Sequence, residues 1–84
     1  MGVTLLYFAS LREAVGLSRE DIPLEAGSTV SALVESLRGR GKAWNDALAP
    51  GKSWRVAVNQ QMASLATPVR PGDEVAFFPP VTGG

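Results

Sequence analysis

The hydrophobic positions of this chain form two apolar runs near its ends and one helical stripe between them. Val3–Ala9 is apolar almost throughout, which is typical of a central strand covered on both faces. Glu74–Phe78 is a second strongly apolar run. Between the two runs, four residues follow the spacing i, i+3, i+4 and i+7, which predicts an amphipathic helix that packs on a sheet: Val30, Leu33, Val34 and Leu37.

Weaker patterns predict the remaining elements. A short helical turn over Ser10–Gly16 has Ser10 as its N-cap, and Ser28 or Thr29 caps the main helix. We expect an edge strand over Asp21–Glu25 and a second short helix over Ala43–Ala49. A third strand is expected over Trp54–Val58, and a weaker fourth strand over Met62–Thr67.

The order of these elements is strand, strand, helix, strand, strand, strand, which favours an α+β fold of the ubiquitin-like β-grasp type. We expect a mixed sheet of about five strands with one main helix and one or two short helices. In such a fold the first and last strands are parallel neighbours at the centre of the sheet. They are also the two most hydrophobic strands of this chain.

Composition limits the chemistry that the side chains can perform. Among the 84 residues there is no cysteine and no histidine, so thiolate chemistry, disulfides and the usual neutral-pH general base are missing. Eight basic residues balance eight acidic ones without a basic run, which argues against binding to nucleic acid. With no signal peptide and no apolar run that spans a bilayer, we expect one small cytoplasmic domain that does not bind a membrane.

The last six residues differ from the body of the chain and read Pro79-Pro80-Val81-Thr82-Gly83-Gly84. Each proline lacks an N–H, so the last strand cannot continue through them. A diglycine end has no Cβ and fits a narrow slot. We therefore divide the chain into a β-grasp domain, residues 1–78, and an extended tail, residues 79–84, that presents a terminal carboxylate to a partner. The alternative is a frayed end without a function.

The two central strands also predict a docking surface. Alternate residues of a strand face opposite sides, so Ala76 and Phe78 point away from the face that holds Val75. Beside the first strand they join Leu6 and Phe8 in an apolar patch close to the tail, although ordinary core is the alternative.

Arg12 follows the first strand and lies within the predicted helical turn. It is either a solvated surface residue or the partner of a carboxylate on another protein.

The ending from Gly72 to Gly84 closely resembles that of the small, MoaD-type sulfur carrier subunits of molybdopterin synthase, which belong to the MoaD/ThiS family of ubiquitin-like proteins. The run of two phenylalanines, two prolines and two glycines carries most of the specificity. The resemblance spans the chain in length and element order. Three further pairs fit the family: Phe8-Ala9, Arg12-Glu13 and Val58-Asn59.

This resemblance implies a cycle of activation at the terminal glycine. An activating enzyme consumes ATP to adenylate Gly84, and sulfur then replaces AMP to leave 1-thioglycine at that position. The charged carrier donates its sulfur to cyclic pyranopterin monophosphate in molybdenum cofactor biosynthesis. The subunit itself is expected to be non-catalytic and to hold no permanent cofactor or metal, with the catalytic side chains on its partner.

The resemblance also assigns roles to the residues around the tail. Gly83 provides steric clearance, and Val81 and Thr82 thread the channel of the partner. The expected partners are the large subunit of molybdopterin synthase, a ubiquitin-activating-like adenylyltransferase and a sulfurtransferase that donates the sulfur. The docking positions carried over are Phe8, Arg12, Phe78, Pro79 and Pro80.

Three other functions fit the same sequence features. A sulfur carrier of thiamine thiazole synthesis has the same fold and the same diglycine end. A ubiquitin-like protein modifier uses the same adenylation but forms an isopeptide bond with lysine. A plain β-grasp interaction module would have an inert tail.

Overall fold

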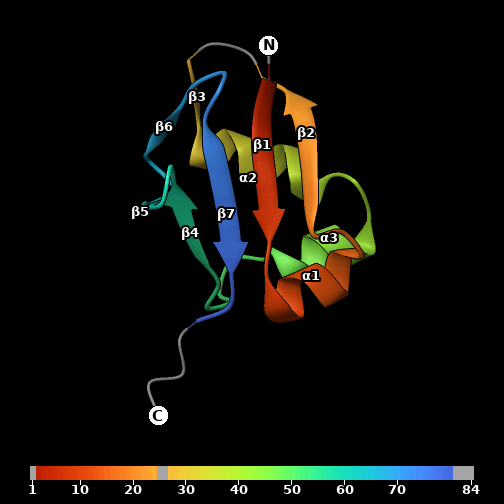
Figure 1. Cartoon of the computed structure of the whole chain (residues 1–84). Coiled ribbons are helices and arrows are strands. Elements are labelled where there is room, and N and C mark those ends of the chain that lie inside the picture. Colours follow the sequence, from red (N-terminus) through yellow and green to blue (C-terminus); the bar gives the residue numbers. More distant parts are fainter. Residues whose placement is uncertain (1, 25–26, 81–84) are drawn as a thin grey trace.

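The structure is a computed structural model that describes residues 2–24 and 27–80 (Figure 1). It contains a mixed five-stranded sheet with the helix α2 packed behind it and two shorter helices at one end. In order along the chain, the elements are β1 (Gly2–Tyr7), α1 (Ala9–Val15), β2 (Arg19–Pro23), β3 (Ser28–Thr29), α2 (Val30–Arg38), α3 (Lys42–Ala47), β4 (Arg55–Val58), β5 (Gln61–Met62), β6 (Pro68–Val69) and β7 (Glu74–Phe78).

The strand order in the main sheet is β2-β1-β7-β4-β5. The first and last strands are therefore neighbours near the centre, and they run parallel with Leu5 opposite Val75. Every other pairing in this sheet is antiparallel. The α+β class and the central parallel pair predicted from the sequence are confirmed.

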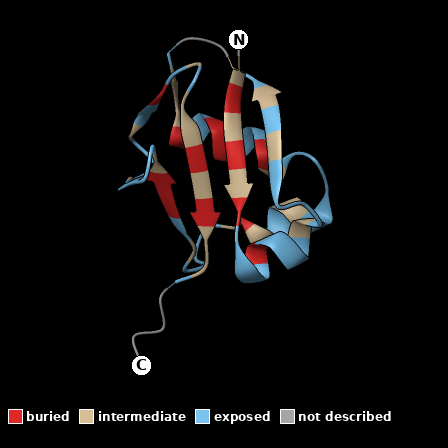
Figure 2. Cartoon of the chain, viewed as in Figure 1, coloured by how far each residue is buried: buried red, intermediate tan, exposed pale blue. Residues whose placement is uncertain are grey.

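The core lies between the sheet and α2. Inward residues of β1 and β7 alternate with less buried ones, as the bands in Figure 2 show. The rings of Tyr7 and Phe77 stack with 5.9 Å between their centroids, and Phe77 is fully buried. All four residues of the predicted helical stripe are buried against this layer: Val30, Leu33, Val34 and Leu37.

A polar network attaches the chain after α2 to the edge of the sheet. The Tyr7 hydroxyl donates a hydrogen bond of 3.0 Å to Glu20 Oε2, and Arg40 Nη1 donates one of 2.7 Å to the same oxygen. The Arg40 guanidinium also lies 4.6 Å from the centroid of the Trp44 ring. One carboxylate thus joins β1, β2 and the segment between α2 and α3.

Local hydrogen bonding corrects the predicted cap of the first helix and selects one of the two caps predicted for α2. Ser10 is not an N-cap: α1 begins at Ala9, and the Phe8 carbonyl accepts bonds from the backbone N–H groups of Leu11 and Arg12. The chain turns directly from the end of β1 into the helix, with Ala9 at φ 50°. Thr29 is the cap of α2, since its hydroxyl accepts from the N–H of Ala32 at 3.2 Å.

The weak strand predicted over Met62–Thr67 is wrong as a single element. Ser64 and Thr67 instead close a turn, in which the Ser64 N–H donates to Thr67 Oγ1 at 3.0 Å. This turn separates β5, which pairs with β4, from β6, which pairs with β3 in a small second sheet. The edge strand also lies two residues earlier than predicted, over Arg19–Pro23. In the described part of the chain, no helix is long and apolar enough to cross a membrane.

Candidate docking face and tail exit

The central strand β7 leads directly to the tail. It ends at Phe78, which pairs with Arg55 of β4, and Pro79 and Pro80 follow. The chain leaves the body at the end of the sheet where α1 lies (Figure 1). Four predicted tail residues fall outside the described residues: Val81, Thr82, Gly83 and Gly84.

A small hollow of about 240 Å³ lies where the tail begins. Its walls come from α1, from the segment before β4 and from the two prolines, and include Leu11, Lys52 and Trp54. Pro79 is half-buried and Pro80 is exposed. The first tail residues therefore rest against the body before the described chain ends.

An apolar row crosses the face of the sheet opposite α2. The strand register places Leu6 beside Ala76, Ala76 beside Ala57, and Ala57 beside Met62. Paired residues point to the same side of a sheet, and none of these four belongs to the core cluster under α2. The row, which we call the open-face row, therefore runs across four strands.

The open-face row contains two residues that the sequence prediction missed. Ala57 is 7% exposed, and Met62 is 62% exposed. The alternation of β4 assigns Ala57 to the face away from Val56, but only the pairing register aligns it with Leu6 and Ala76. No pattern within β5 could reveal that Met62 extends the row.

Phe8 and Phe78 lie on adjoining chain segments at the tail end of this face. The Phe8 N–H donates to the Phe77 carbonyl at 3.1 Å, which extends the contact between the two central strands by one residue. Phe8 is 46% exposed, and Phe78 is half-buried. The structure thus brings the predicted patch together at the surface, and its role in docking remains a proposal.

Arg12 lies in the last turn of α1 and is exposed. None of the ion pairs found among the described residues includes it. Its guanidinium is therefore available at the same end of the molecule as the tail exit.

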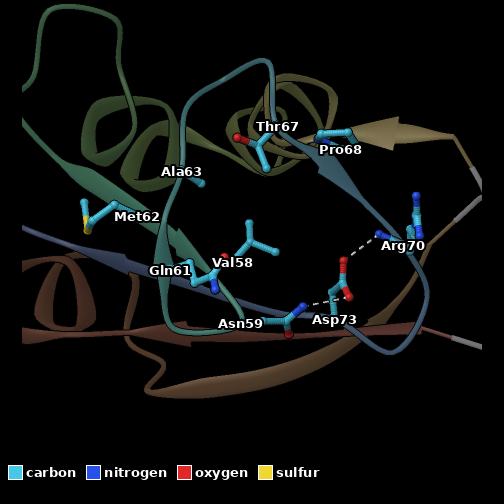
Figure 3. A pocket seen from close by; sticks show the side chains of 9 residues that line it. All are labelled: Val58, Asn59, Gln61, Met62, Ala63, Thr67, Pro68, Arg70 and Asp73. Carbon is cyan, nitrogen blue, oxygen red and sulfur yellow. Dashed lines mark hydrogen bonds between the residues drawn. The ribbon is translucent and has the colours of Figure 1, made fainter.

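A second hollow, of about 450 Å³, opens beside the β4–β5 turn and the chain before β7 (Figure 3). In it, Asn59 Nδ2 donates to Asp73 Oδ1 at 3.0 Å, and the Arg70 backbone N–H donates to Asp73 Oδ2 at 2.9 Å. The bond from Asn59, with the backbone bond from Arg70, lowers the pKa of the Asp73 carboxyl.

Asn59 also accepts from the N–H of Glu74, the first residue of β7. The polar groups of this hollow thus fasten the start of β7, whereas the tail leaves from the other end of that strand. The described residues contain no group of three or more potential metal-ligating side chains. The features around the tail exit are therefore the stronger candidate for a functional site.

The fold and this site define a ubiquitin-like β-grasp protein whose central last strand leads into the terminal segment. The crystal structure of SAMP1 from Haloferax volcanii is similar with a TM-score of 0.77 and 27% identity, covering 100% of both chains. A complex of subunits 1 and 2 of the molybdopterin-converting factor from Helicobacter pylori contains a chain similar at TM-score 0.67 and 25% identity, again with 100% of both chains covered.

The sequence comparisons identify the family. The ThiS family model matches residues 5–84, and the chain belongs to that family. It is 43% identical over 82 residues to the molybdopterin synthase sulfur carrier subunit of Escherichia coli, a match that covers 98% of this chain and 99% of that protein. The resemblance to this family predicted from the sequence is confirmed.

Proposed function

We propose that this chain is the sulfur carrier subunit of a molybdopterin synthase. The observation that supports it most directly is the match of 98% of the chain to the E. coli carrier subunit, together with a central strand that ends at the double proline. The family match runs through residue 84 and so includes the diglycine. In this function the β-grasp domain positions the tail, and the terminal glycine of the tail carries the sulfur.

The chemistry takes place on the carboxylate of Gly84. A free carboxylate is a poor electrophile because its leaving group would be oxide. Reaction with ATP forms the glycyl adenylate and releases pyrophosphate, so that a sulfur nucleophile can then displace AMP. The product is a thiocarboxylate, 1-thioglycine, and the side chains that catalyse both steps belong to the activating enzyme.

The charged carrier docks on the large subunit through the open-face row and the residues beside the tail. Phe8 supplies exposed aromatic area, the half-buried Phe78 extends it, and Arg12 supplies a cation for a partner carboxylate. Pro79 and Pro80 direct Val81 and Thr82 into the channel of the large subunit. Gly83 has no Cβ, which allows close approach at the reacting end, and the sulfur passes to cyclic pyranopterin monophosphate.

Mass spectrometry of the tail peptide tests this proposal. The chain is incubated with the activating enzyme from its own organism, ATP and hydrosulfide, and is then cleaved after Glu74. The released peptide, residues 75–84, contains no methionine, so oxidation of methionine cannot imitate the replacement of oxygen by sulfur. We expect that replacement at Gly84. A peptide of unchanged mass, obtained with an enzyme shown to be active, would contradict the proposal.

Lengthening the tail provides a matched control. Adding one alanine after Gly84, or deleting Gly84, removes the reacting group from its expected position without changing any described residue. We expect both variants to lose sulfur transfer to the large subunit and to keep the thermal unfolding midpoint of the parent. Transfer at the parental rate from the extended chain would indicate an inert tail.

A second candidate function is protein modification. It is favoured by the similarity to SAMP1, since another structure of that protein is described as small archaeal modifier protein 1 and is 26% identical to this chain. The same adenylate would then react with a lysine amine to form an isopeptide bond. A branched lysine adduct in the mass spectrum, in place of the thiocarboxylate, would identify this function.

A further inference from the structure

A groove of about 470 Å³ lies beside the outer edge of β4 and β5. Trp54 and Met62 contribute to its walls, and Leu65 lies on the chain that follows β5. Met62 is 62% exposed and Leu65 is 50% exposed, and both are among the few large apolar side chains at the surface of the described residues. Because exposed apolar area next to a hollow is typical of binding sites, this groove is a candidate docking site.

The charges that line the groove have one sign. Lys52 and Arg55 are the charged residues among the described residues that line it, and none of those lining residues carries a carboxylate. Within residues 2–24 and 27–80, neither cation takes part in an ion pair. The chain as a whole is neutral, so this local positive charge reflects the placement of two cations and not a general excess. The groove therefore favours a negatively charged occupant.

The groove is continuous with the docking face and with the tail exit. Met62 belongs both to the open-face row and to the groove. Lys52 lines the groove and also the hollow that Pro80 helps to form. A protein that covers the open-face row and receives the tail would therefore lie over the groove as well.

We propose that the groove accepts a segment of the large subunit in which a carboxylate side chain lies next to a leucine-sized apolar side chain. The carboxylate pairs with Lys52 and Arg55, and the apolar side chain fills the space between Met62 and Leu65. This inference rests on the proposed function and names the chemistry that the docking partner must present. Two cations are too few for the phosphate contacts of a nucleic acid, whereas they match one or two carboxylates of a protein.

The test is the affinity of the chain for the large subunit from the same organism, measured by calorimetry. Leu65→Ser removes an apolar wall of the groove, and Lys52→Glu reverses one charge. We expect each variant to weaken binding at least about tenfold, in the range typical of central interface residues. The affinity of the parent chain should fall with added salt, and this dependence should be weaker for Lys52→Glu.

Two matched variants control for nonspecific effects. Leu17→Ser also removes an exposed leucine and Lys42→Glu also reverses a lysine, but neither residue lines the groove. We expect both to bind within about twofold of the parent chain. Thermal midpoints of all four variants identify any loss of affinity that is due to misfolding.

The outcomes separate this inference from the proposed function. If the parent chain binds the large subunit, and the Leu65→Ser and Lys52→Glu variants bind it with the same affinity, the inference is overturned and the proposed function is left intact. No binding of the parent chain would overturn the proposed function and the inference together. If the parent chain self-associates and Leu65→Ser abolishes this self-association, the occupant of the groove is a second copy of the chain and the inference is overturned.

Discussion

The two residues that join β4 to β5 both adopt left-handed backbone conformations. Asn59 has φ 52° and Gln60 has φ 67°, and the flanking Val58 and Gln61 are paired. A two-residue hairpin loop with positive φ at both positions matches the requirement of a type I′ turn. Asparagine tolerates this region, but glutamine has no local advantage there, so Gln60 carries strain.

Replacing Gln60 by glycine should therefore stabilise the protein. Gln60→Gly gives the Asn-Gly pair that this turn prefers, and we expect the free energy of unfolding to rise by about 0.5–1 kcal/mol. Urea titration followed by circular dichroism measures the change. Gln61→Gly, one position later in β5, is the control and should lower stability by about 0.5–1 kcal/mol. A lower midpoint for Gln60→Gly would contradict the assignment of the turn.

At the scale of elements, β7 has two faces with different tasks. Phe77 is fully buried and makes an edge-to-face contact with Trp54 at 5.9 Å between ring centroids. Phe78 is half-buried and pairs with Arg55 at the tail end of the sheet. The strand thus fixes the core with one phenylalanine and presents the next one to the surface.

Substitution of these neighbours should separate stability from docking. Phe77→Ala leaves a cavity and should lower the free energy of unfolding by about 3–5 kcal/mol. Phe78→Ala should lower it by less than about 1.5 kcal/mol, because the ring is only half-buried, and should weaken binding to the large subunit about tenfold or more. Chemical denaturation and calorimetry measure the two effects. Equal losses of stability would show that Phe78 also belongs to the core.

The sequence was sufficient to predict the elements with strong periodicity. The helical stripe of α2 and the bounds of β7 are as predicted, because burial sets the pattern of both. The region over Met62–Thr67 was not predictable in the same way. The Ser64 N–H donates to Thr67 Oγ1 and the Ala66 N–H donates to Ser64 Oγ, and the turn that these bonds form decides where the strands are interrupted. Hydrogen bonds of this kind produce no repeating pattern of hydrophobic residues from which the sequence could reveal them.

The candidate site was predictable only where it lies on a single strand. Alternation placed Ala76 and Phe78 on the open face, but the contribution of Ala57 and Met62 depends on the register between strands. The positive groove likewise requires Lys52 and Leu65, distant in sequence, to be brought together by the fold. The domain boundary and the roles of Gly83 and Gly84 stay predictions.

At the scale of the whole molecule, the Glu20 carboxylate joins three parts of the fold. The hydrogen bond from Arg40 lowers the pKa of the Glu20 carboxyl below its ordinary value near 4.5, and the bond from Tyr7 acts in the same direction against the effect of burial. Burial first, and then the bond to Glu20, raises the pKa of Tyr7. The folded protein therefore favours the ionised carboxylate of Glu20.

This carboxylate should make stability depend on pH. Its contribution is fully present above the unfolded pKa and is lost as the pH falls through the lower pKa of the folded protein. At about pH 7, we expect Glu20→Gln to be less stable than the parent by about 1 kcal/mol, with the difference vanishing in strong acid. Urea titrations at several pH values measure it.

Asp46→Asn serves as the control for the pH dependence. Its partner Lys42 is 89% exposed, and an ion pair in solvent contributes little. We expect this variant to follow the profile of the parent chain. A constant difference between Glu20→Gln and the parent at all pH values would show that the charge of Glu20 is irrelevant.

The position of β7 between β1 and β4 also affects when the chain can fold during its synthesis. The strand that completes the sheet is the last one in the described chain. Although β1 can pair early with β2, its second neighbour is separated from it by almost the whole sequence. Such long-range pairing folds slowly and late. A nascent or truncated chain that lacks residues 74–78 lacks the strand that joins β1 to β4 in the sheet. A chain can therefore complete its sheet only after the strand that leads into the tail has been synthesised.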